Sequence, residues 1–265
     1  MKPPVFNANW SEETKALYHH DIQEIWDASI NKHIWNQYHN QLQLYLEFAG
    51  VPKLTGQKKI LDVGCAQGTL ALLLAERGHD VVALDLRSHF IEYARSRYTH
   101  GRIRFVACNI LECELHERFD IVFANQIIEH LVYPEQLIRT MKGLLTSGGK
   151  LVVTTPNWRY LRNVLPSFEE LGDASQFGHL QFTADGDGHF FAYKATELEH
   201  IFVNAGFESV EKYVFESPFI SGHLKFRYFH RVVPLSLLRA LDRAVLASPL
   251  APYFAHQLMI VAKHP

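Results

Sequence analysis

Short apolar runs alternate with longer amphipathic stretches through the middle of the chain. The runs are mostly apolar, which is typical of strands that are buried on both faces of a sheet. They cover residues 60–63, 80–84, 103–108, 120–124 and 150–155. The amphipathic stretches repeat apolar residues at helical spacing and include residues 69–77, 88–98, 134–145 and 196–205. We expect Ser88 and Thr196 to cap two of these helices. The alternation predicts a parallel sheet with helices on both faces.

Three segments depart from this alternation. Residues 1–50 carry two predicted helices, which form either a helical cap on the sheet or a lid over a ligand site. Residues 158–190 are rich in Gly and Asp, so we expect a functional loop on the substrate side. Residues 218–254 form an insertion before the last strand, with one clear helix over 234–247. The loop and the insertion are assigned to a main domain over residues 51–265.

Composition narrows the class of protein without identifying it. The chain has 265 residues, 48% of them hydrophobic, which is enough for a substantial core. Its formal charge of −2 argues against binding of nucleic acid, which needs a basic face. The three cysteines lack metal-ligand spacing, and their odd number fits a reducing compartment. Because we find no signal-peptide pattern and no apolar run long enough to span a bilayer, we expect a cytoplasmic protein.

The stretch from Lys59 to Leu86 carries the clearest chemical signal. A strand is followed by the turn Gly64-Cys65-Ala66-Gln67-Gly68, a helix, a second strand and the acid Asp85. Glycines in such a turn let backbone N–H groups approach a ligand, and the acid accepts hydrogen bonds from ribose hydroxyls. The layout therefore predicts a site for a nucleoside-bearing cofactor.

The spacing of the glycines separates two classes of cofactor. A dinucleotide site needs G-x-G-x-x-G, whereas Ala66 and Thr69 replace two of these glycines. Asp62 precedes the turn and is a poor neighbour for a pyrophosphate, but it suits a cationic amino group. S-adenosylmethionine (SAM) is a ligand of that kind, with an adenosine, a sulfonium and an amino acid end.

Several segments, in the same order, resemble one family. They are LDVGCAQG at the glycine turn, FDIVFANQIIEHL at the fourth strand, LLTSGGKLVVTTPN at the fifth and TELEHIFVNAGFE at a late helix. Together they cover about residues 58–215 and resemble the class I SAM-dependent methyltransferases, nearest the ubiquinone-type and small-molecule O-methyltransferase branch. The resemblance implies an α/β, Rossmann-like sheet of seven strands, mostly parallel with the last strand antiparallel. It also implies SAM as the cofactor and S-adenosylhomocysteine (SAH) as its product.

The resemblance further implies a role for each motif residue. Asp62 lies near the amino group of the cofactor, Asp85 binds the ribose, and Asn109 replaces the more usual Asp beside the adenine. The implied cofactor residues are Asp62, Gly64, Cys65, Ala66, Gly68, Asp85, Leu86, Asn109, Ile110, Asn125 and Gln126.

Methyl transfer to a hydroxyl requires removal of a proton, and histidine is the natural base near neutral pH. His189 follows a Gly- and Asp-rich stretch, where related methyltransferases often carry Gly-His-aromatic. It is the first candidate for the catalytic base, and His130 is the second. A histidine that merely ends a loop is the alternative for His189. We expect no metal, because no cluster of carboxylates follows the fourth or fifth strand.

The insertion offers the best indication of the substrate. Between residues 225 and 243, five Lys or Arg stand against one acid, interleaved with aromatic and apolar residues. A basic, apolar segment over residues 225–247 can rest on an anionic membrane surface, which suits a lipid-like acceptor. Contact with a second subunit in a homodimer, or packing on the sheet, are the alternatives. We expect O-methylation of a small or lipid-like molecule; N- or C-methylation, or a non-catalytic SAM-binding partner protein, stay open.

Overall fold

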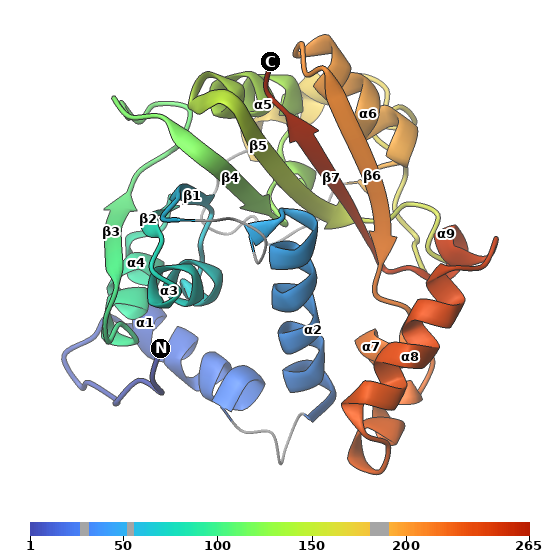
Figure 1. The fold of residues 1–265 in the computed structure, drawn as a ribbon, viewed down its shortest axis with the longest axis horizontal. Coiled ribbons are helices and arrows are strands. Elements are labelled where there is room, and N and C mark those ends of the chain that lie inside the picture. The colour runs from blue at the N-terminus through green and yellow to red at the C-terminus, as the bar shows by residue number, and fades with distance from the viewer. Residues whose placement is uncertain (27–31, 52–55, 181–190) are drawn as a thin grey trace.

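The computed structural model of this chain describes residues 1–26, 32–51, 56–180 and 191–265. A twisted sheet runs through the centre, and helices cover both of its faces (Figure 1). Across the described residues the sheet has seven strands in the order β3-β2-β1-β4-β5-β7-β6. Their bounds are β1 (Lys59–Val63), β2 (Asp80–Asp85), β3 (Arg102–Ala107), β4 (Phe119–Asn125), β5 (Leu145–Pro156), β6 (Ser209–Phe215) and β7 (Gln257–Lys263).

The direction of the strands confirms the predicted fold class. β1 pairs in parallel with β2 on one side and with β4 on the other. β7 pairs antiparallel with both β5 and β6, as the family resemblance implied for the last strand. The chain runs outward from β1 to β3 and then returns to the other side of β1 at β4. This reversal is the switch point at which open α/β sheets bind ligands.

The core is divided between the two faces of the sheet, because successive side chains of a strand point to opposite faces. Leu61 and Val63 pack on the face that α5 (Pro134–Gly143) and α6 (Ala195–Asn204) cover. Ile60 packs on the other face, which α2 (Lys32–Phe48), α3 (Thr69–Glu76) and α4 (Ser88–Ser96) cover. Both faces are therefore closed by helices, as the apolar runs predicted.

The N-terminal segment forms α1 (Glu12–Asp21) and the short π-helix η1 (Ile22–Trp26) before α2. Ser11 caps α1 by accepting a hydrogen bond from the backbone N–H of Thr14. α1 packs against α4, while α2 lies between the sheet and the C-terminal insertion (Figure 1). Whether residues 1–50 act as a separate cap stays a prediction.

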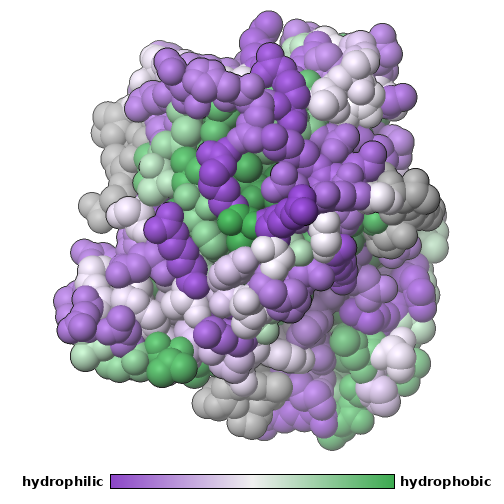
Figure 2. Space-filling view, turned by 60° about the vertical axis from the view of Figure 1, so that its left-hand side comes forward, coloured by the Kyte–Doolittle hydropathy of each residue, from purple (hydrophilic) through white to green (hydrophobic). Residues whose placement is uncertain are grey.

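The insertion before β7 contains four short helical elements. They are α7 (Pro218–Ser221), the 3-10 helix η5 (Phe226–Arg231), α8 (Leu235–Leu246) and α9 (Ala251–Phe254). Leu238 and Asp242 are the buried residues of α8, so most of this helix faces solvent. On the face of the molecule drawn in Figure 2, hydrophilic side chains dominate and hydrophobic ones gather in separate areas.

Several local expectations were wrong at the ends of elements. Arg87, and not Ser88, occupies the cap position of α4, and Lys194, and not Thr196, that of α6. In α6 the side chain of Glu197 accepts a hydrogen bond from the backbone N–H of Lys194, which replaces the expected threonine cap. Another 3-10 helix, η4 (Ala174–Leu180), lies within the predicted substrate-side segment.

Two of the three cysteines are paired in the structure. Cys108 and Cys113 form a disulfide in the loop after β3, and Cys65 is free and buried. The loop brings the two Cα atoms to 5.9 Å, a closeness that the count of three did not indicate. No helix of the described chain is both long and apolar enough to cross a membrane.

Candidate active site

A cavity of about 580 Å³ opens at the carboxyl ends of β1, β2 and β4. It therefore lies at the reversal of strand order between β1 and β4. The loops that follow the strands form one part of its wall, and residues of η1 and α2 form another. The predicted cofactor residues in this wall are Asp62, Gly64, Cys65, Ala66, Asp85, Leu86, Asn109, Ile110, Asn125 and Gln126.

Gly64 shapes the turn after β1. Its φ of +64° lies in the left-handed region, and a Cβ at this position would lie 2.5 Å from Cδ1 of Ile127. A side chain here would both strain the backbone and clash with the loop after β4. Ala66, which stands where the family usually has glycine, also has a positive φ of 44°. The turn keeps its glycine-like shape in spite of that alanine.

Gly68 does not line the cavity; it occupies the cap position of α3 with a φ of +75°. A Cβ there would lie 2.8 Å from Cβ of Ala94, so the glycine lets α3 pack closely against α4. In this structure its contribution to the site is the placement of α3.

Asp85 ends β2 and holds the glycine turn in place. Its Oδ2 accepts a hydrogen bond of 2.9 Å from the backbone N–H of Ala66. Its Oδ1 accepts one of 2.9 Å from the backbone N–H of Arg87. Each carboxylate oxygen has a second lone pair, so both can accept a further hydrogen bond from a ligand. The carboxylate thus stabilises the positive φ of Ala66 and still faces the cavity.

Asp62 is a buried carboxyl group in the same cavity. Burial and the nearby charge of Asp85 raise the pKa of Asp62 to about 7, although a backbone hydrogen bond from Ala71 lowers it. No cationic side chain of the described residues forms an ion pair with Asp62. Two acids in one buried site repel each other, so the cavity favours a ligand with positive charge.

The loops after β3 and β4 complete the predicted set. Oδ1 of Asn109 accepts a hydrogen bond from the backbone N–H of Leu111, which fixes the side chain beside the cavity. Asn125 accepts from the hydroxyl of Thr154. Gln126 has a positive φ of 54°, a sparsely populated conformation that clusters at functional sites.

The two candidate bases differ in what the structure describes. His130 ends the 3-10 helix η3 (Ile128–His130) and lines the cavity. His189 lies outside the described residues. The neighbour of His130, Glu129, is fully buried and accepts a hydrogen bond from the hydroxyl of Thr155. Burial raises the pKa of Glu129 to about 8.

Within the described ranges, no group of three His, Cys, Asp or Glu side chains is placed to hold a metal ion.

A set of cavity residues in the N-terminal helices was not among the site residues predicted from the sequence. They are Glu24, Ile34, Gln37, Tyr38, Gln41, Leu42 and Tyr45. Apart from Glu24 they follow one face of α2 at helical spacing. That periodicity was visible, but it does not show whether a helical face meets the core or a ligand.

Arg97 was also missed, and it joins the N-terminal helices to the glycine turn. Its side chain is fully buried, and Nη1 donates to the carbonyl oxygen of Gln67 at 2.7 Å and to Oγ1 of Thr69 at 2.9 Å. Asp21 at the end of α1 lies 3.6 Å from its Nε. Asp21 also accepts a hydrogen bond of 2.9 Å from Nε1 of Trp26, the last residue of η1.

This switch point brings together a glycine turn, an acid placed to bind a ribose (Asp85) and a buried acid that favours a cation (Asp62). The family described as "Methyltransferase domain" matches residues 18–212. The chain belongs to this family. The resemblance to class I SAM-dependent methyltransferases is therefore confirmed, and the match extends into the N-terminal helices.

Curated relatives of this methyltransferase domain match over part of the chain. An uncharacterized methyltransferase of Mycobacterium tuberculosis (strain ATCC 25618 / H37Rv) is 35% identical over 111 residues, which are 42% of this chain and 56% of the relative. A ubiquinone biosynthesis O-methyltransferase of Leptothrix cholodnii is 32% identical over 123 residues, 44% of this chain and 52% of the relative. The match thus spans about half the length of these relatives.

Solved structures support the fold over nearly the whole domain. Magnesium protoporphyrin IX methyltransferase from Synechocystis PCC 6803, solved with SAH, gives a TM-score of 0.59 at 13% identity, covering 96% of this chain and 95% of that one. The N-methyltransferase NodS from Bradyrhizobium japonicum WM9, also solved with SAH, gives 0.53 at 16% identity, covering 96% and 100%. At such low identity the likeness is one of fold.

Proposed function

We propose that this methyltransferase domain binds SAM in the cavity and transfers its methyl group to a hydroxyl oxygen of a small or lipid-like acceptor. The observation that carries the proposal is the pair of buried carboxyl groups, Asp62 and Asp85, around one cavity. A cationic nucleoside uses both of them, since its amino group pairs with Asp62 and its ribose hydroxyls donate to Asp85.

The other residues of the wall fit the same cofactor. Gly64 and Ala66 turn backbone towards the ligand, and Asn109 with Ile110 forms a polar and apolar edge suited to an adenine. The SAH-bound structural neighbours and the relative named as an O-methyltransferase support this assignment. Bound SAM would supply a methyl group that is already activated by its sulfonium.

The protein then has to align the acceptor, exclude water and accept a proton. The α2 residues that line one side of the cavity would cover a bound cofactor and help to exclude water. His130 lines the cavity, and His189 keeps its place as the first candidate base from the sequence. A base of this kind contributes about 10²–10⁴-fold to the rate.

Calorimetry with SAM and SAH tests the cofactor. We expect one site per chain, and a loss of at least tenfold in affinity for Asp62→Ala and Asp85→Ala. Glu208→Ala removes the same charge from an exposed turn before β6, outside the cavity wall, and should leave the affinity unchanged. If neither compound binds the wild-type chain, or if NAD binds in their place, the proposal is wrong.

Release of SAH in the presence of phenolic, sugar and amine acceptors tests the reaction. Turnover with hydroxyl acceptors supports O-methylation, whereas turnover with amines alone would replace it by N-methylation. Binding of SAH without turnover on any acceptor would indicate a non-catalytic partner protein.

For the base, we expect His189→Ala to abolish most turnover at unchanged SAH affinity. If turnover stays within a few-fold of the wild-type value, His189 is excluded as the catalytic base. His130→Ala is then the variant to test.

We also propose that the segment 225–247 contacts an anionic membrane surface, where a lipid-like acceptor would be found, and that the protein is cytoplasmic. Large hydrophobic side chains are exposed in and beside this segment, at Leu224, Tyr228, Phe229, Val232, Leu237 and Leu241. Lys225, Arg227 and Arg231 are exposed among them. Such a mixture combines apolar insertion with attraction to anionic lipid.

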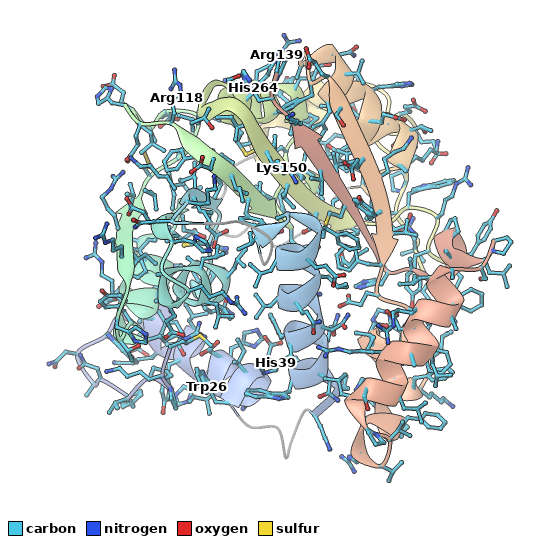
Figure 3. The ribbon with its side chains drawn as sticks, in the orientation of Figure 1. Trp26, His39, Arg118, Arg139, Lys150 and His264 are labelled. Carbon is cyan, nitrogen blue, oxygen red and sulfur yellow. A yellow bond between two sulfur atoms is a disulfide. The ribbon has the colours of Figure 1, made fainter. Side chains whose placement is uncertain are left out.

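Sedimentation with phosphatidylserine vesicles at low salt tests this contact. We expect binding that the double substitution Arg227→Glu and Arg231→Glu removes. Arg118→Glu changes an exposed charge at the opposite end of the molecule and serves as the control (Figure 3). Failure to sediment would exclude the membrane, and a dimer that the same double substitution dissociates would assign the surface to a second copy.

A further inference from the structure

A buried carboxylate holds two amides of the cavity wall. Glu216 follows β6 and is fully buried. Its Oε2 accepts hydrogen bonds from Nε2 of Gln37 at 3.0 Å and from Nε2 of Gln41 at 3.2 Å. The two glutamines lie one turn apart on α2, and both line the cavity. Glu216 therefore links the outer part of the sheet to the wall that covers the site.

This arrangement determines the orientation of both amides. A carboxylate offers only acceptors, so each glutamine must turn its NH₂ group towards Glu216. The carbonyl oxygens of Gln37 and Gln41 are then the groups left for a ligand. The negative charge polarises the two amides and strengthens their carbonyl oxygens as acceptors. This part of the cavity is thus built to receive hydrogen-bond donors.

The conformation of Glu216 is costly, which argues against a purely structural role. Its φ is +71°, and Oε1 is buried without a hydrogen-bond partner among the described residues. Its position is held from outside: the backbone N–H of His256 donates to the Glu216 carbonyl oxygen at 2.9 Å, and the His256 ring lies 3.4 Å from Oε2. Strain that the surroundings maintain in this way is typical of functional sites.

The position of the two glutamines separates them from the predicted cofactor residues. Those residues lie at the carboxyl ends of β1, β2 and β4 and on the loops that follow β1 to β4, whereas Gln37 and Gln41 come from α2. Between and beside the glutamines the wall is apolar or aromatic, at Ile34, Tyr38 and Leu42. The wall suits a molecule with an apolar body and hydroxyl donors.

We propose that Gln37 and Gln41 bind the hydroxyl groups of the methyl acceptor, and that Glu216 is the positioning residue that orients their amides. The assignment rests on the proposed function, since it concerns the part of the cavity that the cofactor leaves open. It narrows the acceptor to a hydroxyl-bearing molecule with an apolar ring or chain.

A matched pair of probes tests the assignment without turnover. Catechol and 1,2-dimethoxybenzene share a ring and differ in their hydroxyl donors, and each is titrated into the SAH-loaded protein. We expect catechol to bind at least tenfold more tightly, because unmet acceptors in a polar site penalise the ether. Gln37→Met and Gln41→Met should each lower the affinity for catechol about fivefold. Each should therefore reduce the preference for catechol over 1,2-dimethoxybenzene.

Glu216→Gln tests the positioning role. We expect a similar loss of catechol affinity, and a shift of the side-chain NH₂ resonances of Gln37 and Gln41 in the ¹⁵N NMR spectrum. The control is Asp242→Asn, which neutralises a nearby buried acid outside the cavity wall. SAH affinity should stay within twofold of the wild-type value in every variant. If SAH does not bind the wild-type protein at all, the proposed cofactor is refuted, which is a different outcome from failure of the glutamine assignment. Equal binding of the two probes, no binding of catechol at millimolar concentration, or an unchanged preference in both glutamine variants would overturn it.

Discussion

Nη1 of Arg97 donates a hydrogen bond of 2.7 Å to the backbone carbonyl oxygen of Gln67, in the middle of the glycine turn. Arg97 belongs to the end of α4, and its acidic neighbour, Asp21, belongs to α1. The guanidinium is fully buried, and desolvation lowers its pKa while Asp21 opposes that shift. One side chain therefore couples the packing of the N-terminal helices to the shape of the turn that faces the cofactor.

This coupling predicts that Arg97 affects cofactor affinity without touching the cofactor. We expect Arg97→Lys to weaken SAH binding about tenfold, because lysine cannot donate in a fork to Gln67 and Thr69 while it faces Asp21. Asp21→Asn should weaken binding less, since the turn keeps both hydrogen bonds. Calorimetry measures the affinities, and hydrogen exchange in residues 12–26 reports the docking of α1. Unchanged SAH affinity in Arg97→Lys would show that the turn does not depend on this contact.

Asp62 predicts a pH dependence of cofactor binding. Its pKa of about 7 means that the carboxyl group is largely protonated below neutral pH in the free protein. A cationic amino group favours the ionised form, so binding releases a proton and the affinity for SAH should rise with pH. We expect a slope of up to about tenfold per pH unit between pH 5.5 and 7 that flattens above pH 7.5. Asp62→Asn should bind weakly with no slope in this window, and an equal slope in that variant would assign the titration to another group.

Gly64 and Gly78 form a matched pair for the strain in the glycine turn. Both have a positive φ, but a Cβ at Gly78 would meet nothing within 4 Å, whereas one at Gly64 would meet Ile127. We expect Gly78→Ala to cost about 1 kcal/mol of unfolding free energy and Gly64→Ala about 2–4 kcal/mol with loss of SAH binding. Urea unfolding measures both. Adding Ile127→Ala to Gly64→Ala should restore part of the SAH affinity. If Gly64→Ala and Gly78→Ala lower the unfolding free energy equally, the contact with Ile127 does not contribute.

Glu129 predicts a loss of stability at alkaline pH. Burial raises its pKa from 4.5 to about 8, so the folded state holds this proton more tightly than the unfolded state. Its contribution to stability is complete below pH 4.5 and disappears as the pH rises through 8. Glu129→Gln keeps an acceptor for the Thr155 hydroxyl and does not ionise. At pH 9 we expect this variant to be about 1–3 kcal/mol more stable than the wild type in urea unfolding. If the difference in unfolding free energy between variant and wild type is the same at pH 6 as at pH 9, the prediction is wrong.

Much of the fold and of the cofactor wall could be predicted because their signals are local. Buried parallel strands are continuous apolar runs, so β1, β2 and β4 were visible directly. Asp62, Gly64 and Asp85 stand at the ends of such runs, and parallel strands bring their carboxyl ends to one edge. The caps of α4 and α6 were mistaken because a neighbouring residue of suitable type lay one or two positions away. Predictions at His189 stay open, since it lies outside the described residues.

By itself, the sequence determined the alternation of strands and helices, the switch point beside β1 and the acids that face it, because each depends on neighbours along the chain. Only the tertiary structure decided which residues from distant segments share the site. Gln37 meets Glu216 across 179 residues, and Arg97 meets Gln67 across 30. Such pairs leave no periodic trace in the sequence, since a glutamine on a helix is equally compatible with solvent, core or ligand until packing selects its partner.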